Sequence, residues 1–201
     1  MRSGAQGQAL RPPVSSSKRD AVLRAALELF AERTFGATPV PDIACRAQVG
    51  AGTVYRYFAG KEELANVLFR QCKGTMREAL REALAGSTDA REQFRLLWRG
   101  LSRFAVEQPQ MMRFLEMQHH DDYLDSKSRA VSTELFEAAE RFVREGQRAG
   151  TIRAGSPGVL IALVFGAFVG MIKESEQGRF ELTARTIEQA GETAWRMLEM
   201  L

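Results

Sequence analysis

Residues 40–64 constrain the fold of this chain more than any other part of its sequence. Ile43 and Ala47 fall on one face of a short predicted helix over residues 40–47, and a second short helix is predicted over residues 51–57. Two such helices joined by about four residues form a helix-turn-helix, whose second helix can enter the major groove of DNA. This segment therefore predicts a small helical unit that binds DNA.

The string T-V-Y-R-Y-F-A-G-K-E-E-L over residues 53–64 is far more specific than helix spacing alone. With Leu29 and Phe30 it resembles the N-terminal DNA-binding domain of the TetR family of transcriptional repressors. The resemblance is dense over residues 18–68, and beyond them only the helical layout is similar. It implies an all-α protein of about nine helices, with a three-helix DNA-binding domain followed by a helical ligand-binding and dimerisation domain.

Three departures from the family pattern fall near the turn. Gln48 stands where glycine is usual, and a left-handed conformation there costs about 1–2 kcal/mol. Gly50 replaces a serine N-cap, a loss of about a few tenths of a kcal/mol. Pro39 and Pro41 are tolerated because the first turn of a helix lacks intrahelical partners for its N–H groups. These departures leave open an alternative, a helical small-molecule-binding protein that has lost specific DNA binding.

The rest of the chain also reads as helical, because its apolar spacing is near 3.6 and strand signals are nearly absent. We expect a disordered basic tail over residues 1–17, a DNA-binding domain over 18–62 and a ligand-binding and dimerisation domain over 63–201. The further helices are expected over 18–33, from 60 to about Gly86, from a cap at Asp89, from Pro109, over 126–149, from Pro157 and from about 183. Thr38 is expected to cap the helix over 40–47.

Charge is unevenly distributed between these regions. Residues 1–61 carry 9 Lys and Arg against 4 Asp and Glu, whereas the remainder carries 19 against 21. A basic N-terminal third joined to a slightly acidic remainder is typical of a DNA-binding protein with a second module that does not touch DNA.

The second helix of the pair offers the chemistry that DNA binding needs. The phenols of Tyr55 and Tyr57 can reach phosphate oxygens, and Arg56 can donate to the two major-groove acceptors of guanine. Lys61 lies at a helix N-terminus, which favours a phosphate. The resemblance implies DNA contacts at the following positions: Gly52, Thr53, Tyr55, Tyr57 and Lys61, and often Arg46. The alternatives are that Tyr55 belongs to the core and that Arg46 and Arg56 are solvated surface residues.

No catalytic constellation, phosphate loop or metal spacing stands out in the C-terminal part, so we expect no enzymatic activity and no cofactor. Glu116 with His119 or His120 could share a helix face and bind a metal. A solvated helix end is the preferred interpretation, so no metal site is predicted. Cys45 and Cys72 give no disulfide framework, which favours the cytoplasm, and a sensing role for Cys45 or the histidines stays open.

Large apolar side chains crowd the two helices that follow Asp89, and methionine is suited to adaptable pockets. Plain core packing is the alternative, but members of the resembling family commonly hold a small molecule in this region. We therefore predict a small, largely apolar effector, without identifying it. The candidate pocket residues are Phe94, Trp98, Leu101, Met111, Phe114 and Phe168.

The segment 159–172 is the most apolar stretch, and at about 14 residues it is predicted to be too short to span a bilayer. It is better interpreted as a helix buried on two sides, with the second side covered by a twofold-related copy. The candidate interface residues are Ile161, Phe165, Val169, Trp195 and Leu198. A dimer also places two helix-turn-helix units on a palindromic site. The sequence thus predicts a homodimeric repressor that an effector releases from its operator.

Overall fold

The computed structural model of the chain describes residues 17–84 and 89–200. These residues form helices and no strand, so the predicted all-α fold is confirmed. The nine helices are α1 (Lys18–Arg33), α2 (Val40–Arg46), α3 (Ala51–Tyr57), α4 (Lys61–Leu84), α5 (Ala90–Glu107), α6 (Pro109–Glu116), α7 (Ser126–Arg148), α8 (Pro157–Glu176) and α9 (Ala184–Arg196). The tail predicted over 1–17 lies outside the described residues except for Ser17, and so does the helix end predicted near Gly86.

Side-chain caps fix where several helices begin. The Ser17 hydroxyl accepts a hydrogen bond from the N–H of Asp20, and the Asp20 carboxylate accepts one from the N–H of Ser17, which makes a capping box for α1. Asp89 accepts from the N–H of Glu92 at 2.8 Å and begins α5 as predicted. At the other end of α7, Gly150 takes φ 72°, a left-handed conformation that stops the helix.

The predicted cap of α2 is wrong. Pro39 occupies the N-cap position, and no side chain caps this helix. Thr38 is fully buried instead, and its hydroxyl donates to the carbonyl oxygen of Thr34 at 2.7 Å. The hydroxyl therefore ties the α1–α2 connection to the end of α1. An extended Pro39 is enough to begin α2, since the first-turn N–H groups of a surface helix can bond to water.

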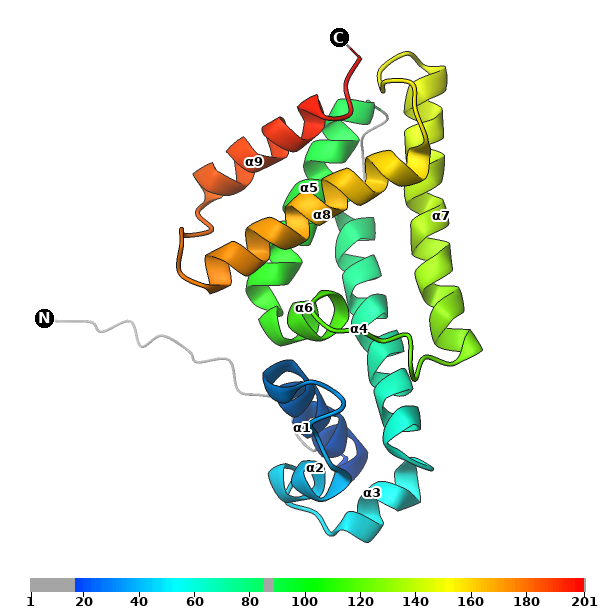
Figure 1. Cartoon of the computed structure of the whole chain (residues 1–201), viewed down its shortest axis with the longest axis vertical. Helices are drawn as coiled ribbons and strands as arrows, with labels where there is room; N and C mark the ends of the chain where they lie inside the picture. Colours follow the sequence, from blue (N-terminus) through cyan, green and yellow to red (C-terminus); the bar gives the residue numbers. More distant parts are fainter. Residues whose placement is uncertain (1–16, 85–88, 201) are drawn as a thin grey trace, which may run out of the picture.

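Helices α1, α2 and α3 pack against one another at one end of the molecule (Figure 1). The predicted stripe of α1 forms their core: Val22, Ala26, Leu29 and Phe30 are all buried. Ile43 of α2 and Val54 of α3 are buried in the same cluster.

Helix α4 runs from this end into the C-terminal part, where it packs against α5 and α7 (Figure 1). Helix α6 returns to α1, and the rings of Phe30 and Phe114 stack there with centroids 5.8 Å apart. Helix α9 lies along α5, and α8 packs against α7. The small three-helix unit is thus joined to the larger part by α4 and by the contact between α1 and α6.

Helix α8 begins at Pro157 as predicted but differs from its prediction in burial. It has 20 residues, so by length and composition it is long and apolar enough to cross a bilayer, and the expectation that the apolar segment is too short for this is wrong. The helix continues beyond the apolar stretch through a polar turn that ends at Glu176. Within one chain it is buried on one side only, through Leu160, Phe168 and Ile172.

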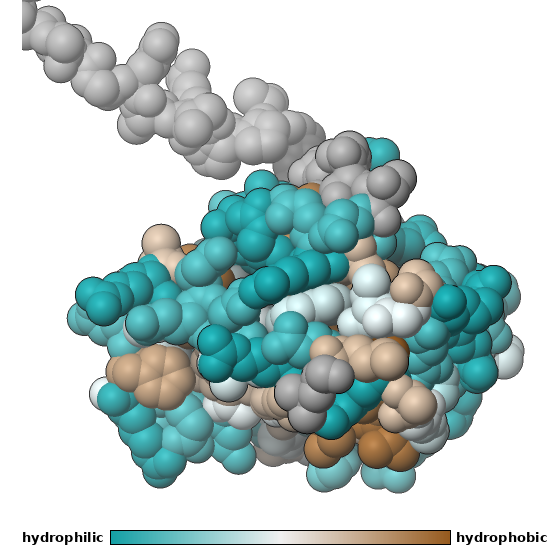
Figure 2. Space-filling view, turned by 90° about the horizontal axis from the view of Figure 1, so that it is seen from above, coloured by the Kyte–Doolittle hydropathy of each residue, from teal (hydrophilic) through white to brown (hydrophobic). Residues whose placement is uncertain are grey.

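Hydrophobic side chains are therefore left at the surface along α8. Val159 and Leu163 are 57% and 53% exposed, and Phe136 of α7 is 47% exposed. Figure 2 views the end of the molecule away from the helix-turn-helix, and most of that surface is hydrophilic. Elsewhere in the described residues, the exposed large hydrophobic side chains are Tyr55, Val106, Phe180 and Met200.

Candidate nucleic-acid interface

The turn between α2 and α3 brings the two helices close together. Ala44 is buried at their crossing, and the N–H of Val49 donates to its carbonyl oxygen at 3.0 Å. Gln48 has φ 55°, so it takes the left-handed conformation considered for this position. Gly50 is the N-cap of α3 without a side-chain bond. The turn is therefore formed despite both departures from the family pattern.

Helix α3 divides into a packed face and an outward face. Val54 and Phe58 are buried, whereas Gly52 and Arg56 are exposed and Tyr55 is 55% exposed. A Cβ added at Gly52 would meet no atom within 4 Å. The alternative that Tyr55 belongs to the core is therefore excluded within one chain.

Two side chains on the outward face hold each other. The guanidinium of Arg56 donates to the phenol oxygen of Tyr57 at 3.2 Å and lies 5.1 Å from the centre of its ring. Tyr57 and Thr53 are half-buried at the edge of the same face. One N–H of Arg56 is thus engaged by Tyr57, and the guanidinium keeps further N–H donors.

Lys61 is the first residue of α4 and is half-buried. Its ammonium donates to the carbonyl oxygen of Phe35 at 2.9 Å and lies 4.2 Å from the centre of the Phe35 ring. A lysine ammonium has three donors, so one bond to Phe35 leaves others for a phosphate oxygen. The lysine side chain is thus already held in one place before DNA arrives.

Arg46 is placed differently from the residues of α3. Its guanidinium pairs with Glu28 at 3.0 Å and with Glu32 at 3.3 Å, both on α1. Hydrogen bonding to Glu32, and then to Glu28, raises the pKa of Arg46 above its ordinary value. In this structure the guanidinium is engaged by two acids, and all three side chains are exposed enough for it to change partner.

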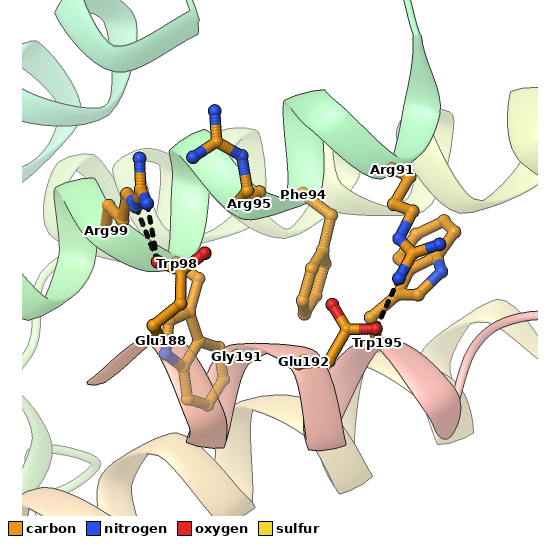
Figure 3. Close-up of a pocket in the computed structure, with 9 residues that line it drawn as sticks. All are labelled: Arg91, Phe94, Arg95, Trp98, Arg99, Glu188, Gly191, Glu192 and Trp195. Atoms are coloured by element: carbon orange, nitrogen blue, oxygen red, sulfur yellow. Dashed lines mark hydrogen bonds and ion pairs between the residues drawn. The ribbon is translucent and has the colours of Figure 1, made fainter. Parts of the chain in front are cut away.

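The residues predicted to bind an effector do not meet around one cavity. Phe94 and Trp98 of α5 lie against α9, where they line a cleft of about 30 Å³ with Gly191 and Trp195 (Figure 3). Phe168 packs edge-on against Trp98, with centroids 5.4 Å apart. About 30 Å³ is the share of one water in the liquid, so a larger molecule could enter only after side chains moved.

The other predicted pocket residues lie elsewhere. Phe114 is fully buried against Phe30 at the contact between α6 and α1. Leu101 and Met111 are half-buried against the common core. Phe114 therefore packs the junction between the two parts of the chain.

Charged side chains cover the cleft beside Trp98. Arg91 pairs with Glu192, and Arg99 pairs with Glu188 at 2.6 Å, so two ion pairs join α5 to α9 above the aromatic rings (Figure 3). The indole N–H of Trp98 donates to the carbonyl oxygen of Ile187 at 2.9 Å. These bonds hold α9 against α5.

Two of the predicted interface residues are inside the chain's own core. Trp195 is 4% exposed and packs on Phe94, and Leu198 is 3% exposed. The prediction that they lie at a surface between copies is therefore wrong. Within the chain itself, the apolar face of α9 packs against α5.

Of the other predicted interface residues, Phe165 and Val169 lie on a flank of α8 between its buried and exposed sides, whereas Ile161 lies on the buried side with Phe168 and Ile172. Ile161, Phe165 and Val169 are half-buried. The most exposed large hydrophobic side chains on α8 are Val159 and Leu163, which the sequence analysis did not identify. At 100° per residue they lie opposite Phe168 and Ile172, but both sides of the helix are apolar, so its spacing alone does not say which side is exposed.

The acidic and histidine cluster after α6 is split by the fold. Glu116 pairs with Lys73 at 2.7 Å, whereas His119 is exposed. His120 is buried, with one ring nitrogen bonded to the Tyr123 hydroxyl and the other 3.2 Å from the carbonyl oxygen of Leu115. Desolvation by this burial lowers the pKa of His120. Within residues 17–84 and 89–200, no group of three or more His, Cys, Asp or Glu could hold a metal ion.

Comparisons with known proteins agree with this architecture. A family model described as bacterial regulatory proteins of the tetR family matches residues 22–68, and one described as the tetracyclin repressor-like C-terminal domain matches residues 69–200. A TetR family transcription regulator from Marinobacter aquaeolei superimposes with a TM-score of 0.82. It is 27% identical, and the match covers 92% of this chain and 96% of that one.

Two curated relatives match by sequence. An uncharacterised HTH-type transcriptional regulator from Haemophilus influenzae is 22% identical over 157 residues, which is 78% of this chain and 82% of the relative. An HTH-type transcriptional repressor from Mycobacterium tuberculosis is 46% identical over 48 residues, which is 24% of this chain and 26% of the relative. The second match is confined to a quarter of either chain.

Proposed function

This chain belongs to the TetR family and is a DNA-binding transcriptional regulator. From this we propose that it is a homodimeric repressor that a small molecule releases from its operator. The observation that carries this proposal is the outward face of α3, where Gly52, Tyr55 and Arg56 are exposed over a packed three-helix core. Repression is supported by the name of the mycobacterial relative.

On this proposal α3 enters the major groove, and each residue has a separate task. Gly52 lets the backbone approach a base edge or sugar, and Arg56 reads a base. Thr53, Tyr55, Tyr57 and Lys61 contact phosphates and set the orientation of α3. Arg46 joins them by exchanging Glu28 and Glu32 for a phosphate.

The exposed side of α8 supports dimerisation. Val159 and Leu163 share this side with Gly166 and Gly170, where an added Cβ would meet no atom within 4 Å. A second copy of α8 can approach closely over such small residues and cover the two large ones. We expect about 1,500 Å² or more to be buried in total, which is in the range of stable homodimers. Contact with a second copy would also explain why a 20-residue apolar helix is exposed on one side, with no need for a membrane to cover it.

The effector site is proposed at the cleft between α5 and α9, enlarged when Trp98 moves. The aromatic side chains that line it favour a largely apolar molecule, and the arginines above it could contact a polar end. An effector that binds only the enlarged form would shift the protein toward conformations whose two α3 helices no longer match the half-site spacing.

The remaining assignments complete the proposal. We propose a DNA-binding domain over residues 18–62 and a ligand-binding and dimerisation domain over 63–201, with α4 crossing the boundary between them. The protein would act in the cytoplasm, where the chromosome is, and would have no enzymatic activity.

An electrophoretic shift with the DNA that flanks its own gene tests the proposal. A specific complex should survive an excess of unrelated duplex of equal length, and its protein content should correspond to a dimer for each palindromic site. Binding that unrelated duplex removes equally well would favour the alternative, a helical small-molecule-binding protein that has lost specific DNA binding.

A further inference from the structure

We propose that Phe35 and Tyr123 are positioning residues for the phosphate contact of Lys61, so that the C-terminal part of the chain sets where this ammonium lies. The inference rests on the proposed role of Lys61 at DNA. It assigns a task to the loop between α6 and α7, which is not itself near α3.

The first contact is between Lys61 and Phe35. The ammonium bonds to the Phe35 carbonyl oxygen at 2.9 Å and lies 4.2 Å from the centre of the Phe35 ring. A cation over an aromatic face within about 6 Å of its centre is attracted by the ring quadrupole. Both interactions involve the same residue, so the place of the ammonium follows the place of Phe35.

The second contact is between Phe35 and Tyr123. Their rings stack with centroids 4.0 Å apart and planes inclined by 24°. Since the Tyr123 ring occupies one face of Phe35, the ammonium of Lys61 must lie over the other. Phe35 is thus sandwiched between a side chain of the α6–α7 loop and the lysine that faces DNA.

Tyr123 is in turn fixed by the C-terminal part of the chain. Its hydroxyl bonds to His120, and its carbonyl oxygen accepts from the side chain of Asn66 on α4 at 2.7 Å. The amide oxygen of Asn66 accepts from the N–H of Asp125 at 2.8 Å, which holds the following residues of the loop as well. Asn66 is 3% exposed and Tyr123 is 8% exposed, so these bonds are shielded from water.

A consequence follows for regulation. A movement of the α6–α7 loop against α4 would displace the Tyr123 ring. Phe35, which holds the Lys61 ammonium, would then lose the ring stacked on its other face. An effector could therefore weaken the phosphate contact through this stack even before the two α3 helices change their separation.

A double-mutant cycle tests this on the full-length protein. The probe is a labelled DNA duplex of mixed sequence, roughly 30 base pairs or about three helical turns, at low salt, because a phosphate contact forms on any sequence. Lys61→Ala should weaken binding about tenfold and Tyr123→Leu about threefold, while the double variant should bind no more weakly than Lys61→Ala alone. Tyr123→Phe keeps the ring stack and should bind nearly like wild type.

The matched control is the same cycle with Tyr57→Phe, a phosphate contact that does not rest on Phe35. Its effect and that of Tyr123→Leu should add. Additive effects of Lys61→Ala and Tyr123→Leu would overturn the inference alone. A Lys61→Ala variant that binds like wild type would overturn the phosphate contact itself, and this inference with it.

A second measurement does not depend on Tyr123→Leu being folded. In the wild-type protein, protons on the ε carbon of Lys61 should resonate upfield of their usual position, because this carbon is bonded to the ammonium nitrogen that lies 4.2 Å from the centre of the Phe35 ring. Phe35→Leu should remove this shift. Lys61 ε protons at ordinary positions in wild type would contradict the proposed arrangement.

Discussion

Helices α3 and α8 both present a face that their own chain leaves uncovered, but the two faces differ in chemistry. The α3 face carries phenols, a guanidinium and a glycine, whereas the α8 face carries Val159, Leu163 and small residues. Donors that can bond to phosphates suit a charged, hydrated partner. Branched apolar side chains beside small residues on one helix face suit a partner surface that excludes water. This difference in chemistry is what we expect if α3 meets DNA and α8 meets a second copy of the chain, as proposed.

The largest expected effect concerns the α8 face. Leu163→Glu places one carboxylate per chain in the proposed interface, so a dimer would bury two like charges near its twofold axis. We expect dimer dissociation to become at least about 1,000-fold easier, or about 4 kcal/mol, by analogy with other buried unpaired charges. Sedimentation of wild type and variant at micromolar concentration measures this.

Val106→Glu is the matched control for that experiment. Val106 of α5 is 54% exposed, almost the same as the 53% of Leu163, but it is not on α8. It should leave the dimer intact. A wild type that sediments as a monomer, or a Leu163→Glu variant that remains a dimer, would remove α8 from the interface.

The second effect concerns the α3 face. Gly52→Val has room in the free protein, since an added Cβ would meet nothing within 4 Å, so the fold should be preserved. The branched side chain would keep the backbone from a base edge, and specific binding should fall by about 100-fold or more for two half-sites, about 2.7 kcal/mol. Gel shift with the operator fragment, with thermal unfolding as a check on folding, measures it.

Gly74→Val is the control for helix chemistry alone. Gly74 lies within α4, and an added Cβ there also meets nothing within 4 Å. Its DNA affinity should equal that of wild type. If both glycine variants bind the operator like wild type, α3 does not approach the bases as proposed.

The two faces were not equally predictable from the sequence. The bounds of α3 and the packed positions Val54 and Phe58 follow from apolar spacing, and the residue string over 53–64 gave the family. Val159 and Leu163 were missed because α8 is apolar nearly all round, so its sequence does not say which side the protein's own core uses. Only the placement of Phe168 against Trp98 decides that.

Contacts between residues far apart in the chain could not be predicted from the sequence either. Trp195 lies on the apolar face of α9 and was expected at an interface, yet it packs on Phe94, about a hundred positions earlier in the chain. The stack of Phe35 on Tyr123 joins a loop of the DNA-binding part to a loop of the C-terminal part, and neither residue carries a local pattern. Spacing within one helix cannot predict which element will cover it.

The third effect is smaller and concerns Lys61. It distinguishes a phosphate contact, which is independent of DNA sequence, from a contact to a base. Lys61→Ala removes one phosphate contact per half-site, so the slope of log affinity against log salt should decrease by about 1 for each half-site. Affinity should fall about equally on operator and unrelated DNA. A titration across salt concentrations with both duplexes measures this, and an unchanged slope would take Lys61 out of the interface.

The smallest effect concerns the junction between the two regions, at His120. Desolvation lowers the pKa of this buried imidazole below 6.5, whereas the unfolded chain keeps the ordinary value. As pH falls through 6.5, the unfolded chain takes up a proton that the folded chain does not, so stability is full above this pH and decreases below it. The loss ends once pH passes the lowered pKa of the folded state. Thermal unfolding of wild type and His120→Gln between about pH 7 and pH 5 measures it, with at most about 1.4 kcal/mol per pH unit for one group.

The matched variant for this last experiment is His119→Gln, which removes the neighbouring exposed imidazole and should keep the wild-type pH dependence. Asp125 also has a lowered pKa, chiefly because its carboxylate accepts from the N–H of Ser128. Its contribution is lost only as pH falls below the ordinary aspartate value of 3.8, so it does not interfere in the chosen window. Since His120 bonds to Tyr123, its protonation also acts on the ring beneath Phe35. If wild type and His120→Gln lose stability in parallel, the buried imidazole is not the titrating group, and the junction between the DNA-binding and C-terminal parts is insensitive to pH in this range.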